Sequence, residues 1–199
     1  KNLAQGNPIK LEINIDTEIA DPVRANKMVQ DLIVECVNAA LCGIDLETYV
    51  EDEERNNALQ MHIARIRYLG LSSKNRAISV LWEHLTPQTI NSFRAILANK
   101  RVTKVFHNLT YDTGVLQNPF YRFRIDGDLE DTLLGHHAAF PGLRHALQGV
   151  ACQFRGIPPW KSEFRDGKRE DVDDPAEEAV YNATDIFATV KTVAPIHVW

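Results

Sequence analysis

Residues 41–50 have the sequence LCGIDLETYV, and the rest of the chain is best understood from this stretch outward. Apolar residues precede Asp45 and Glu47, and Leu46 stands between these two acids. In a β-strand, residues i and i+2 point to the same face, so both carboxylates leave one side of the strand and Leu46 leaves the other. Two carboxylates this close repel each other. A divalent cation between them is one interpretation, and a solvated strand end is the other.

Length, charge and hydropathy place limits on the class of protein. The chain has 199 residues, enough for one well-cored domain and short for two, so we expect a single domain over residues 1–199. Its net charge of −5 argues only weakly against nucleic acid, because an acidic metal site accounts for much of such an excess. No apolar run is long enough to span a membrane and no signal peptide opens the chain, so no membrane partner is expected. Since the first residue is Lys1, we expect a domain excised from a longer protein or a trimmed terminus.

The cysteines indicate the redox compartment. The chain has three of them, Cys36, Cys42 and Cys152, an odd number without C-x-x-C spacing. This pattern favours buried thiols in a reducing compartment over a disulfide framework or a zinc site. The sequence therefore predicts an intracellular location.

The first half of the chain predicts a helix followed by an antiparallel meander. Alternation predicts a strand over residues 9–15, and Asp21 before Pro22 is typical of a helix start. This strand and helix form an extension over residues 1–40 that leads into the acidic strand. Two apolar segments, 62–71 and 77–82, then flank the turn SSKNR and predict a hairpin.

The second half predicts mostly helices. The expected elements are a helix starting at Thr86-Pro87, a strand over 102–106, a turn and helix over 107–116, a short strand over 123–125, and helices over 131–140, 143–154 and 175–193. Residues 155–174 are rich in Gly, Pro and charge, and are expected to form a long irregular segment. Together these elements predict an α/β fold in which a mixed sheet, an antiparallel meander plus parallel strands, is flanked by helices.

Two further acids lie on predicted helices. Asp112 falls near the start of a helix that follows a strand, and Asp185 lies in an otherwise apolar helix. Asp is unfavourable in a helix interior, so its presence there requires a reason. Tyr181 precedes Asp185 by one turn, and both side chains therefore emerge from the same helix face.

Three motifs carry a resemblance to a known family. GIDLET at 43–48, HNLTYD at 107–112 and YNATD at 181–185 resemble the three exonuclease motifs of the DnaQ-like (DEDD) 3′–5′ exonuclease superfamily, tyrosine subclass. The second and third motifs, and DTLLGHHAAFPGL at 131–143, are most similar to the proofreading exonuclease domain of family A DNA polymerases, especially phage-type ones. The resemblance covers residues 40–193. It implies a ribonuclease H-like fold and a polymerase domain in the same or a partner chain.

The resemblance also implies an activity and a metal site. The expected metal ligands are Asp45, Glu47, Asp112 and Asp185. Their hard oxygens suit two divalent ions, Mg²⁺ or Mn²⁺. Such a pair hydrolyses a phosphodiester by in-line displacement, here at single-stranded or frayed DNA 3′ ends with release of nucleoside 5′-monophosphates. Proofreading in the cytoplasm or in a virus-infected cell is the expected setting.

Several residues are candidates for positioning water or substrate. Tyr181 is expected to orient the attacking water, and the alternative is a tyrosine that only packs in the core. Leu46, through its backbone, with Thr48 and Tyr49 is expected to line the pocket of the terminal nucleotide. Asn108 either hydrogen-bonds the DNA end or caps the helix that follows it.

The irregular segment combines aromatic and basic residues. Trp160 and Lys161 are followed by Arg165, Lys168 and Arg169. Interleaved aromatic and basic side chains stack on unpaired bases and hold phosphates, so we expect this segment to contact nucleic acid. A solvated loop with one anchored Trp is the alternative.

The histidines and one further acid are interpreted as supporting residues. The spacing of His107, His136, His137 and His145 is not that of a zinc site. His107 follows a predicted strand and is a candidate for the layer around the metal ligands, whereas His136 or His137 is expected to pack against neighbours. Asp131 is expected to start or support a helix.

Two other functions remain open from the sequence. One is a 3′–5′ exoribonuclease of the RNase D type, which shares the tyrosine subclass. The other is a relative without catalysis that binds nucleic acid or braces a polymerase. Loss of some of the four acids would mark that case, and all four are present.

Overall fold

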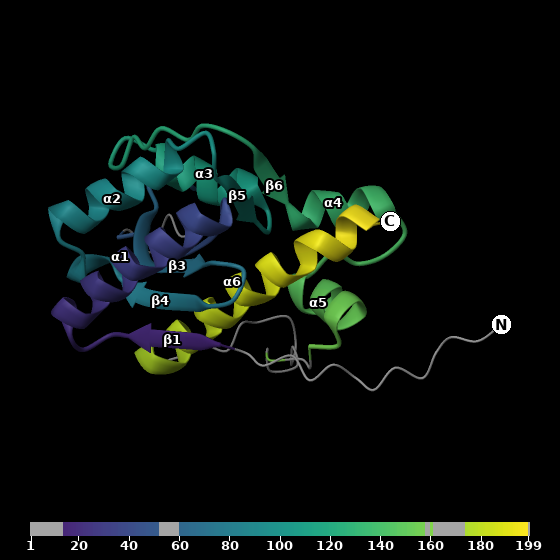
Figure 1. Cartoon of the computed structure of the whole chain (residues 1–199), viewed down its shortest axis with the longest axis horizontal. Coiled ribbons are helices and arrows are strands. Elements are labelled where there is room, and N and C mark those ends of the chain that lie inside the picture. The colour runs from purple at the N-terminus through teal and green to yellow at the C-terminus, as the bar shows by residue number, and fades with distance from the viewer. Residues whose placement is uncertain (1–13, 52–59, 158–159, 161–173, 199) are drawn as a thin grey trace.

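The computed structural model describes residues 14–51, 60–157, 160 and 174–198, and a six-stranded sheet forms its centre (Figure 1). The strand order is β1-β4-β3-β2-β5-β6. β2, β3 and β4 form an antiparallel meander, β1 joins β4 in parallel, and β5 and β6 continue from β2 in parallel. The strands are β1 (Ile15–Glu18), β2 (Leu41–Tyr49), β3 (Arg65–Ser72), β4 (Ala77–Leu81), β5 (Thr103–Phe106) and β6 (Leu129–Asp131). The predicted mixed sheet, including its meander, is confirmed.

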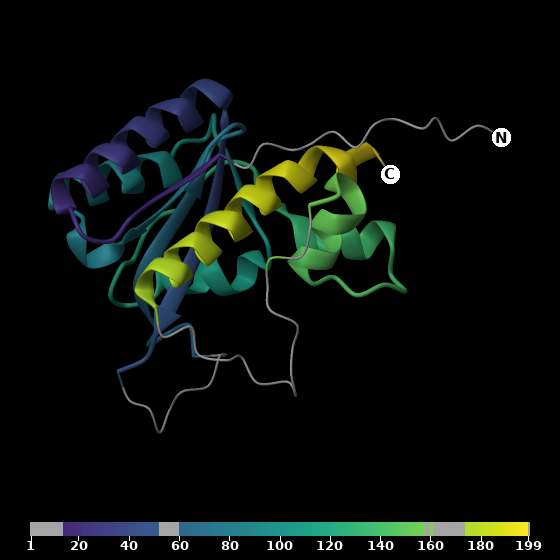
Figure 2. The same ribbon diagram turned by 90° about the horizontal axis from the view of Figure 1, so that it is seen from below.

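Helices cover both faces of this sheet. They are α1 (Pro22–Ala39), α2 (Pro87–Leu97), α3 (Leu109–Gln117), α4 (Thr132–Ala139), α5 (Leu147–Arg155) and α6 (Pro175–Val198), with a short 3-10 helix η2 (Trp82–His84). Figure 2 shows α1 and α2 on one side of the sheet and α6 crossing the other. α4 and α5 both pack against α6. In the part of the chain that the structure describes, no helix is both long and apolar enough to cross a membrane.

Successive side chains of β2 point to opposite faces of the sheet, one covered by α1 and α2 and the other by α6. Cys42, Ile44 and Leu46 are buried in the main apolar core, which also contains the inner side chains of α1 and α2. Gly43 lies on the opposite face, against α6, where a Cβ atom would stand 2.4 Å from Val190 Cγ2. Because glycine has no Cβ, α6 can approach the strand this closely. The carboxylate of Asp45 is on the same face as Gly43 and therefore points towards α6.

Two predicted helix starts are confirmed by their caps. The Asp21 carboxylate accepts hydrogen bonds from the backbone N–H groups of Val23 and Arg24, and Pro22 occupies the first turn. The Thr86 hydroxyl accepts from the N–H of Thr89 at the start of α2. Both side chains satisfy N–H groups that have no partner within the helix.

One predicted strand is corrected, and another falls mostly outside the described residues. Of the segment 9–15 the structure describes only the last two residues, and the described strand is Ile15–Glu18. The segment 123–125 is not a strand, because Phe123 turns into an aromatic cluster with Trp82 and Phe93. The backbone pairs with β5 only later, at Leu129–Asp131. Side-chain packing, which short apolar runs do not specify, decides this difference.

The helical segments near the C-terminus also differ from expectation. The helix predicted over 143–154 begins only at Leu147, because the backbone of Ala146 is extended, with ψ of 133°. His145, just before it, hydrogen-bonds the side chains of His136 and His137. α6 continues to Val198, beyond the predicted end at 193. Cys36 and Cys42 are buried as expected, but Cys152 is exposed, so the prediction of three buried thiols is wrong for that residue.

Candidate active site

The acidic pair of β2 lies where the strand changes its pairing. Asp45 pairs in register with Gly70 of β3, and Glu47 pairs with Tyr68. Between Glu47 and Thr48 the register shifts through a bulge. Bulges bend a strand and redirect its side chains. Both carboxylates are half-buried, consistent with a position between the sheet and the layer formed by α6.

Asp112 joins this pair from the first turns of α3. Its side chain is 4% exposed, and the backbone N–H of Leu46 donates to its Oδ1 at 3.1 Å. The third acid therefore lies directly beside the strand that carries the first two. Burial raises the pKa of the Asp112 carboxyl well above its usual range and the charge of Glu47 adds to this, while the hydrogen bond from Leu46 opposes it.

α6, which covers one face of the sheet, carries the fourth acid. Asp185 is 7% exposed, and Asn182, which precedes it by one turn, donates from Nδ2 to Asp45 Oδ2 at 2.6 Å. This bond ties α6 to β2 at the acidic pair. Tyr181 is half-buried on the same stretch of helix. The elements that carry all four predicted ligands thus meet at one place.

Trp160 also reaches this place. Its indole Nε1–H donates to Asp185 Oδ1 at 2.6 Å, and its ring packs against a small apolar cluster of α5 and α6 that includes Leu147 and Ala188. The residue predicted to stack on bases therefore contacts a predicted metal ligand. Lys161, Arg165, Lys168 and Arg169, the basic residues predicted to bind phosphate, lie outside the described residues.

The donor set suits hard divalent cations, although its side chains are held by other partners. Carboxylate oxygens are the preferred ligands of Mg²⁺ and Mn²⁺. Within residues 14–51, 60–157, 160 and 174–198, no three His, Cys, Asp or Glu side chains come together as a metal-binding group. Asn182 holds an oxygen of Asp45 and Trp160 holds an oxygen of Asp185. The elements that carry the predicted ligands thus meet at β2, and neutral N–H donors hold three of the carboxylates, those of Asp45, Asp112 and Asp185.

Asp131, and not Asn108, caps α3. Asn108 has a left-handed backbone with φ of 75°, and its side chain makes no capping bond, so the capping interpretation is wrong. The Asp131 carboxylate accepts from the N–H groups of Asn108 at 3.0 Å and Leu109 at 2.9 Å. It also accepts from Leu133 and Leu134 at the start of α4. One side chain therefore fixes two helix starts, which confirms its predicted supporting role.

The residues that follow the acidic pair have partners of their own. The hydroxyl of Thr48 lies 2.5 Å from the hydroxyl of Tyr111 of α3, and the side chain of Tyr49 is 46% exposed. The backbone N–H of Leu46 donates to the carboxylate of Asp112. The predicted pocket residues therefore border the acids, and their contact with a nucleotide stays a prediction.

Sequence patterns did not identify Asn182 or Tyr111 as part of this site. Asn182 is fully buried and connects Asp45 to Ser79 of β4, whose hydroxyl donates to Asn182 Oδ1 at 2.7 Å. Its signal was present in the sequence: it is a polar residue between Tyr181 and Asp185 in a mostly apolar helix. Tyr111 lies inside the motif HNLTYD, but the motif did not assign it a role in the site.

Three of the histidines, His136, His137 and His145, form a cluster of their own. His136 Nδ1 lies 2.7 Å from His145 Nδ1, and His137 Nδ1 lies 2.9 Å from His145 Nε2. His136 is buried against Phe140 and Phe154, so its predicted packing role is confirmed. His107 Nδ1 lies 2.8 Å from the hydroxyl of Thr132, at the junction of β6 and α4.

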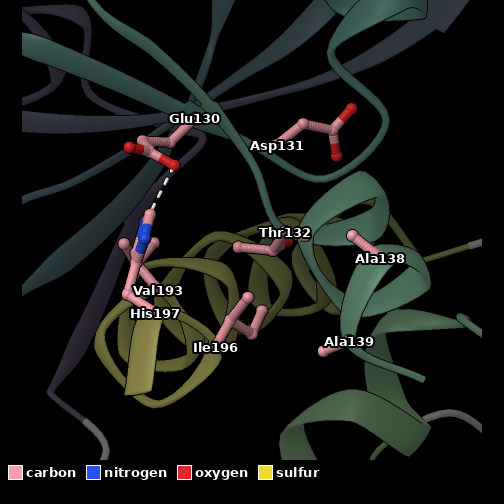
Figure 3. Close-up of a pocket in the computed structure, with 9 residues that line it drawn as sticks. Glu130, Asp131, Thr132, Ala138, Ala139, Val193, Ile196 and His197 are labelled. Atoms are coloured by element: carbon pink, nitrogen blue, oxygen red, sulfur yellow. Dashed lines mark hydrogen bonds and ion pairs between the residues drawn. The ribbon is translucent and has the colours of Figure 1, made fainter. Parts of the chain in front are cut away.

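A pocket of about 370 Å³ lies elsewhere, between α4 and the end of α6 (Figure 3). Gly135, Ala138 and Ile196 give it a largely apolar wall, and His197 pairs with Glu130 at 3.0 Å on its rim. None of the predicted metal ligands lines this pocket. This pocket is therefore not part of the acidic site.

Comparisons with known proteins agree with the arrangement of the motifs. No curated protein sequence matches the chain. The solved structure of Escherichia coli RNase D, an exoribonuclease, is 17% identical with a TM-score of 0.65 and matches 94% of this chain and 45% of its own. For Trypanosoma brucei RNase D in complex with RNA U12, the identity is 14% and the TM-score 0.67, over 92% of this chain and 62% of its own. Brucella melitensis NrnC is 16% identical with a TM-score of 0.62, over 94% of this chain and 80% of its own.

These likenesses show the DnaQ-like, ribonuclease H-like fold, and the chain spans less than two thirds of either RNase D structure. The family model described as 3′–5′ exonuclease matches residues 12–194, nearly the whole chain and all three motifs. The chain therefore belongs to the 3′–5′ exonuclease family.

Proposed function

We propose that this protein is a metal-dependent exonuclease that hydrolyses the terminal phosphodiester of DNA at single-stranded or frayed 3′ ends. The products are nucleoside 5′-monophosphates. One observation supports the proposal: the elements that carry Asp45, Glu47, Asp112 and Asp185 are joined to one another at β2. Asp112 of α3 accepts from the Leu46 N–H, and α6 is bonded to Asp45 through Asn182. Membership of the exonuclease family supports the reaction.

The four acids are proposed to hold two divalent cations of the Mg²⁺ or Mn²⁺ type. When bound, these ions supply charge neutralisation at the phosphate and acidify the attacking water. Asp45 and Glu47 offer oxygens from the rigid strand, Asp112 from α3 and Asp185 from α6. Among the solved structures of this fold, one of Brucella melitensis NrnC contains bound Mg²⁺.

Tyr181 is proposed to hold the attacking water through its phenol group. A phenol O–H both donates and accepts hydrogen bonds, so this role is one of orienting the water rather than of removing its proton. Thr48, Tyr49 and the Leu46 backbone are proposed to contact the terminal nucleotide. Asn108, whose side chain does not cap α3, is proposed to hydrogen-bond the strand end. Trp160 and Lys161 are proposed to contact the preceding nucleotides.

Tyr181→Phe is expected to lower kcat about 10²-fold, because a poorly placed nucleophile costs about this much. KM for the oligonucleotide should change little, since the phenol ring remains. Single-turnover hydrolysis of a labelled oligonucleotide measures the effect. A tyrosine that only packs in the core would give wild-type kcat with a lowered melting temperature.

The substrate class is tested by rates on matched DNA and RNA oligonucleotides of one sequence. We expect faster release of mononucleotides from DNA, on the basis of the resemblance to polymerase proofreading domains. Asp185→Asn protein prepared in parallel detects contaminating nucleases. Faster hydrolysis of RNA would replace the DNA proposal with the exoribonuclease one, which the two RNase D structures favour.

The alternative to an enzyme is a protein that binds nucleic acid without catalysis. It is supported by the absence of a three-residue metal-binding group among the described side chains. Titration with Mn²⁺ separates the two proposals. A binding module would retain oligonucleotide affinity while showing neither metal binding nor hydrolysis.

The wider setting is proposed from the same resemblance. The protein would edit mismatched primer ends for a polymerase domain in the same or a partner chain, and primers with mismatched 3′ termini should then be degraded faster than matched ones. The free thiols of Cys36 and Cys42 support an intracellular, reducing compartment. The single exonuclease domain over residues 1–199 stays a prediction.

A further inference from the structure

Asn182 has the geometry of a residue that sets the orientation of a neighbouring carboxylate. Its side chain is fully buried on the face of α6 that crosses the sheet. Its amide Nδ2 donates to Asp45 Oδ2 at 2.6 Å, and its Oδ1 accepts from the hydroxyl of Ser79 at 2.7 Å. Both ends of the amide are therefore assigned, because a carboxylate only accepts and the Ser79 hydroxyl supplies the proton at the other end.

The surroundings hold this amide in one position. Gly70 pairs with Asp45 across β2 and β3, and a Cβ atom at Gly70 would lie 2.6 Å from Asn182 Oδ1. Glycine thus leaves the space that the amide fills. Ser79 is likewise fully buried and pairs with Gly70 from β4. Three neighbouring strands therefore shape one site for a single side chain of α6.

We propose that Asn182 is the positioning residue of Asp45: fixed by Ser79, it sets the plane in which the Asp45 carboxylate meets a divalent cation. This inference rests on the proposed function, because it assigns the same site a supporting residue. A neutral amide suits the task, since it stabilises the carboxylate without bringing a cationic side chain that would compete with the metal. Hydrogen bonds to ligating carboxylates orient them, and loss of such a partner typically costs about 10–100-fold in metal affinity or activity.

The experiment compares Mn²⁺ binding in the wild type, Asn182→Ala, Ser79→Ala and Thr192→Ala by calorimetry. Thr192 is the matched control, because it is a fully buried polar residue of the same helix whose hydroxyl bonds only the backbone of Thr189 in the described structure. We expect Asn182→Ala to raise the dissociation constant about 10–100-fold. Ser79→Ala should raise it less, and Thr192→Ala should leave it unchanged.

Thermal unfolding with and without Mn²⁺ supplies the second measurement. A positioning role predicts that Asn182→Ala needs correspondingly more Mn²⁺ to reach the stabilisation seen in the wild type, because a ligand that binds the folded state raises its stability with concentration. A purely structural role would lower the melting temperature equally with and without metal, and that result overturns the proposal. If Asn182→Ala does not fold, the same Mn²⁺ titration of Ser79→Ala tests the proposal, and an unchanged dissociation constant would contradict it.

Failure of this inference is distinguishable from failure of the proposed function. If the wild type hydrolyses 3′ ends and Asn182→Ala binds Mn²⁺ as tightly as the wild type, the positioning role is wrong and the function stands. If Asn182→Ala weakens Mn²⁺ binding while the wild type releases no mononucleotides from DNA or RNA, the positioning role stands and the function is wrong.

Discussion

Asp185→Asn and Asp45→Asn are each expected to lower the rate of 3′-end hydrolysis by about 10³-fold or more. The reason is the loss of one carboxylate charge from a site proposed to hold two divalent cations. Such ions stabilise the transition state by several kcal/mol, and about 4 kcal/mol corresponds to a factor of 10³. Asn preserves the volume of the side chain and a carbonyl oxygen, so the fold should remain intact. Initial rates in saturating Mn²⁺, with the melting temperature measured in parallel, test the expectation.

The control is another Asp→Asn change that removes the same charge far from the site. Asp31 lies on α1 and pairs only with Lys27, at 2.6 Å on the exposed side of that helix, in the described structure. Asp31→Asn should retain wild-type rates. Rates within tenfold of wild type in both Asp185→Asn and Asp45→Asn would contradict the proposed site.

Asp131→Ala is expected to lower the free energy of unfolding by about 2–3 kcal/mol, because it removes the caps of two helices at once. The four backbone N–H groups served by this carboxylate belong to Asn108, Leu109, Leu133 and Leu134. A change of this size lowers the melting temperature of a domain of this length by about 5–10 °C. Thermal and urea unfolding measure it. Since α3 carries Asp112, the metal dependence of hydrolysis should change as well.

Asp21→Ala provides the matched control, because Asp21 caps α1 alone. This change should lower the free energy of unfolding by about 1 kcal/mol, the usual effect of losing one N-cap. Asp131→Asn keeps an acceptor oxygen, so its free energy of unfolding should lie between those of the wild type and Asp131→Ala. Equal decreases in the free energy of unfolding for Asp131→Ala and Asp21→Ala would show that Asp131 stabilises only one helix start.

Local patterns succeeded where the cause is local. Alternation in LCGIDLETYV places the acids on the face opposite Leu46, as observed, because successive side chains of a strand alternate. Asp21-Pro22 and Thr86-Pro87 start helices as predicted, because capping involves residues two or three positions apart. The strand predicted over 123–125 failed because Phe123 packs against aromatic residues from other elements.

The mixed sheet with its meander, and the choice of four acids and a tyrosine as candidates, could be inferred from the sequence alone. They follow from spacing within strands and helices and from motifs of a few residues. The groups that hold three of those acids became visible only in the folded chain. The bonds from Leu46 to Asp112, Asn182 to Asp45 and Trp160 to Asp185 join residues 66, 137 and 25 positions apart. Contacts of this kind depend on how α3 and α6 pack on β2, which no local pattern contains.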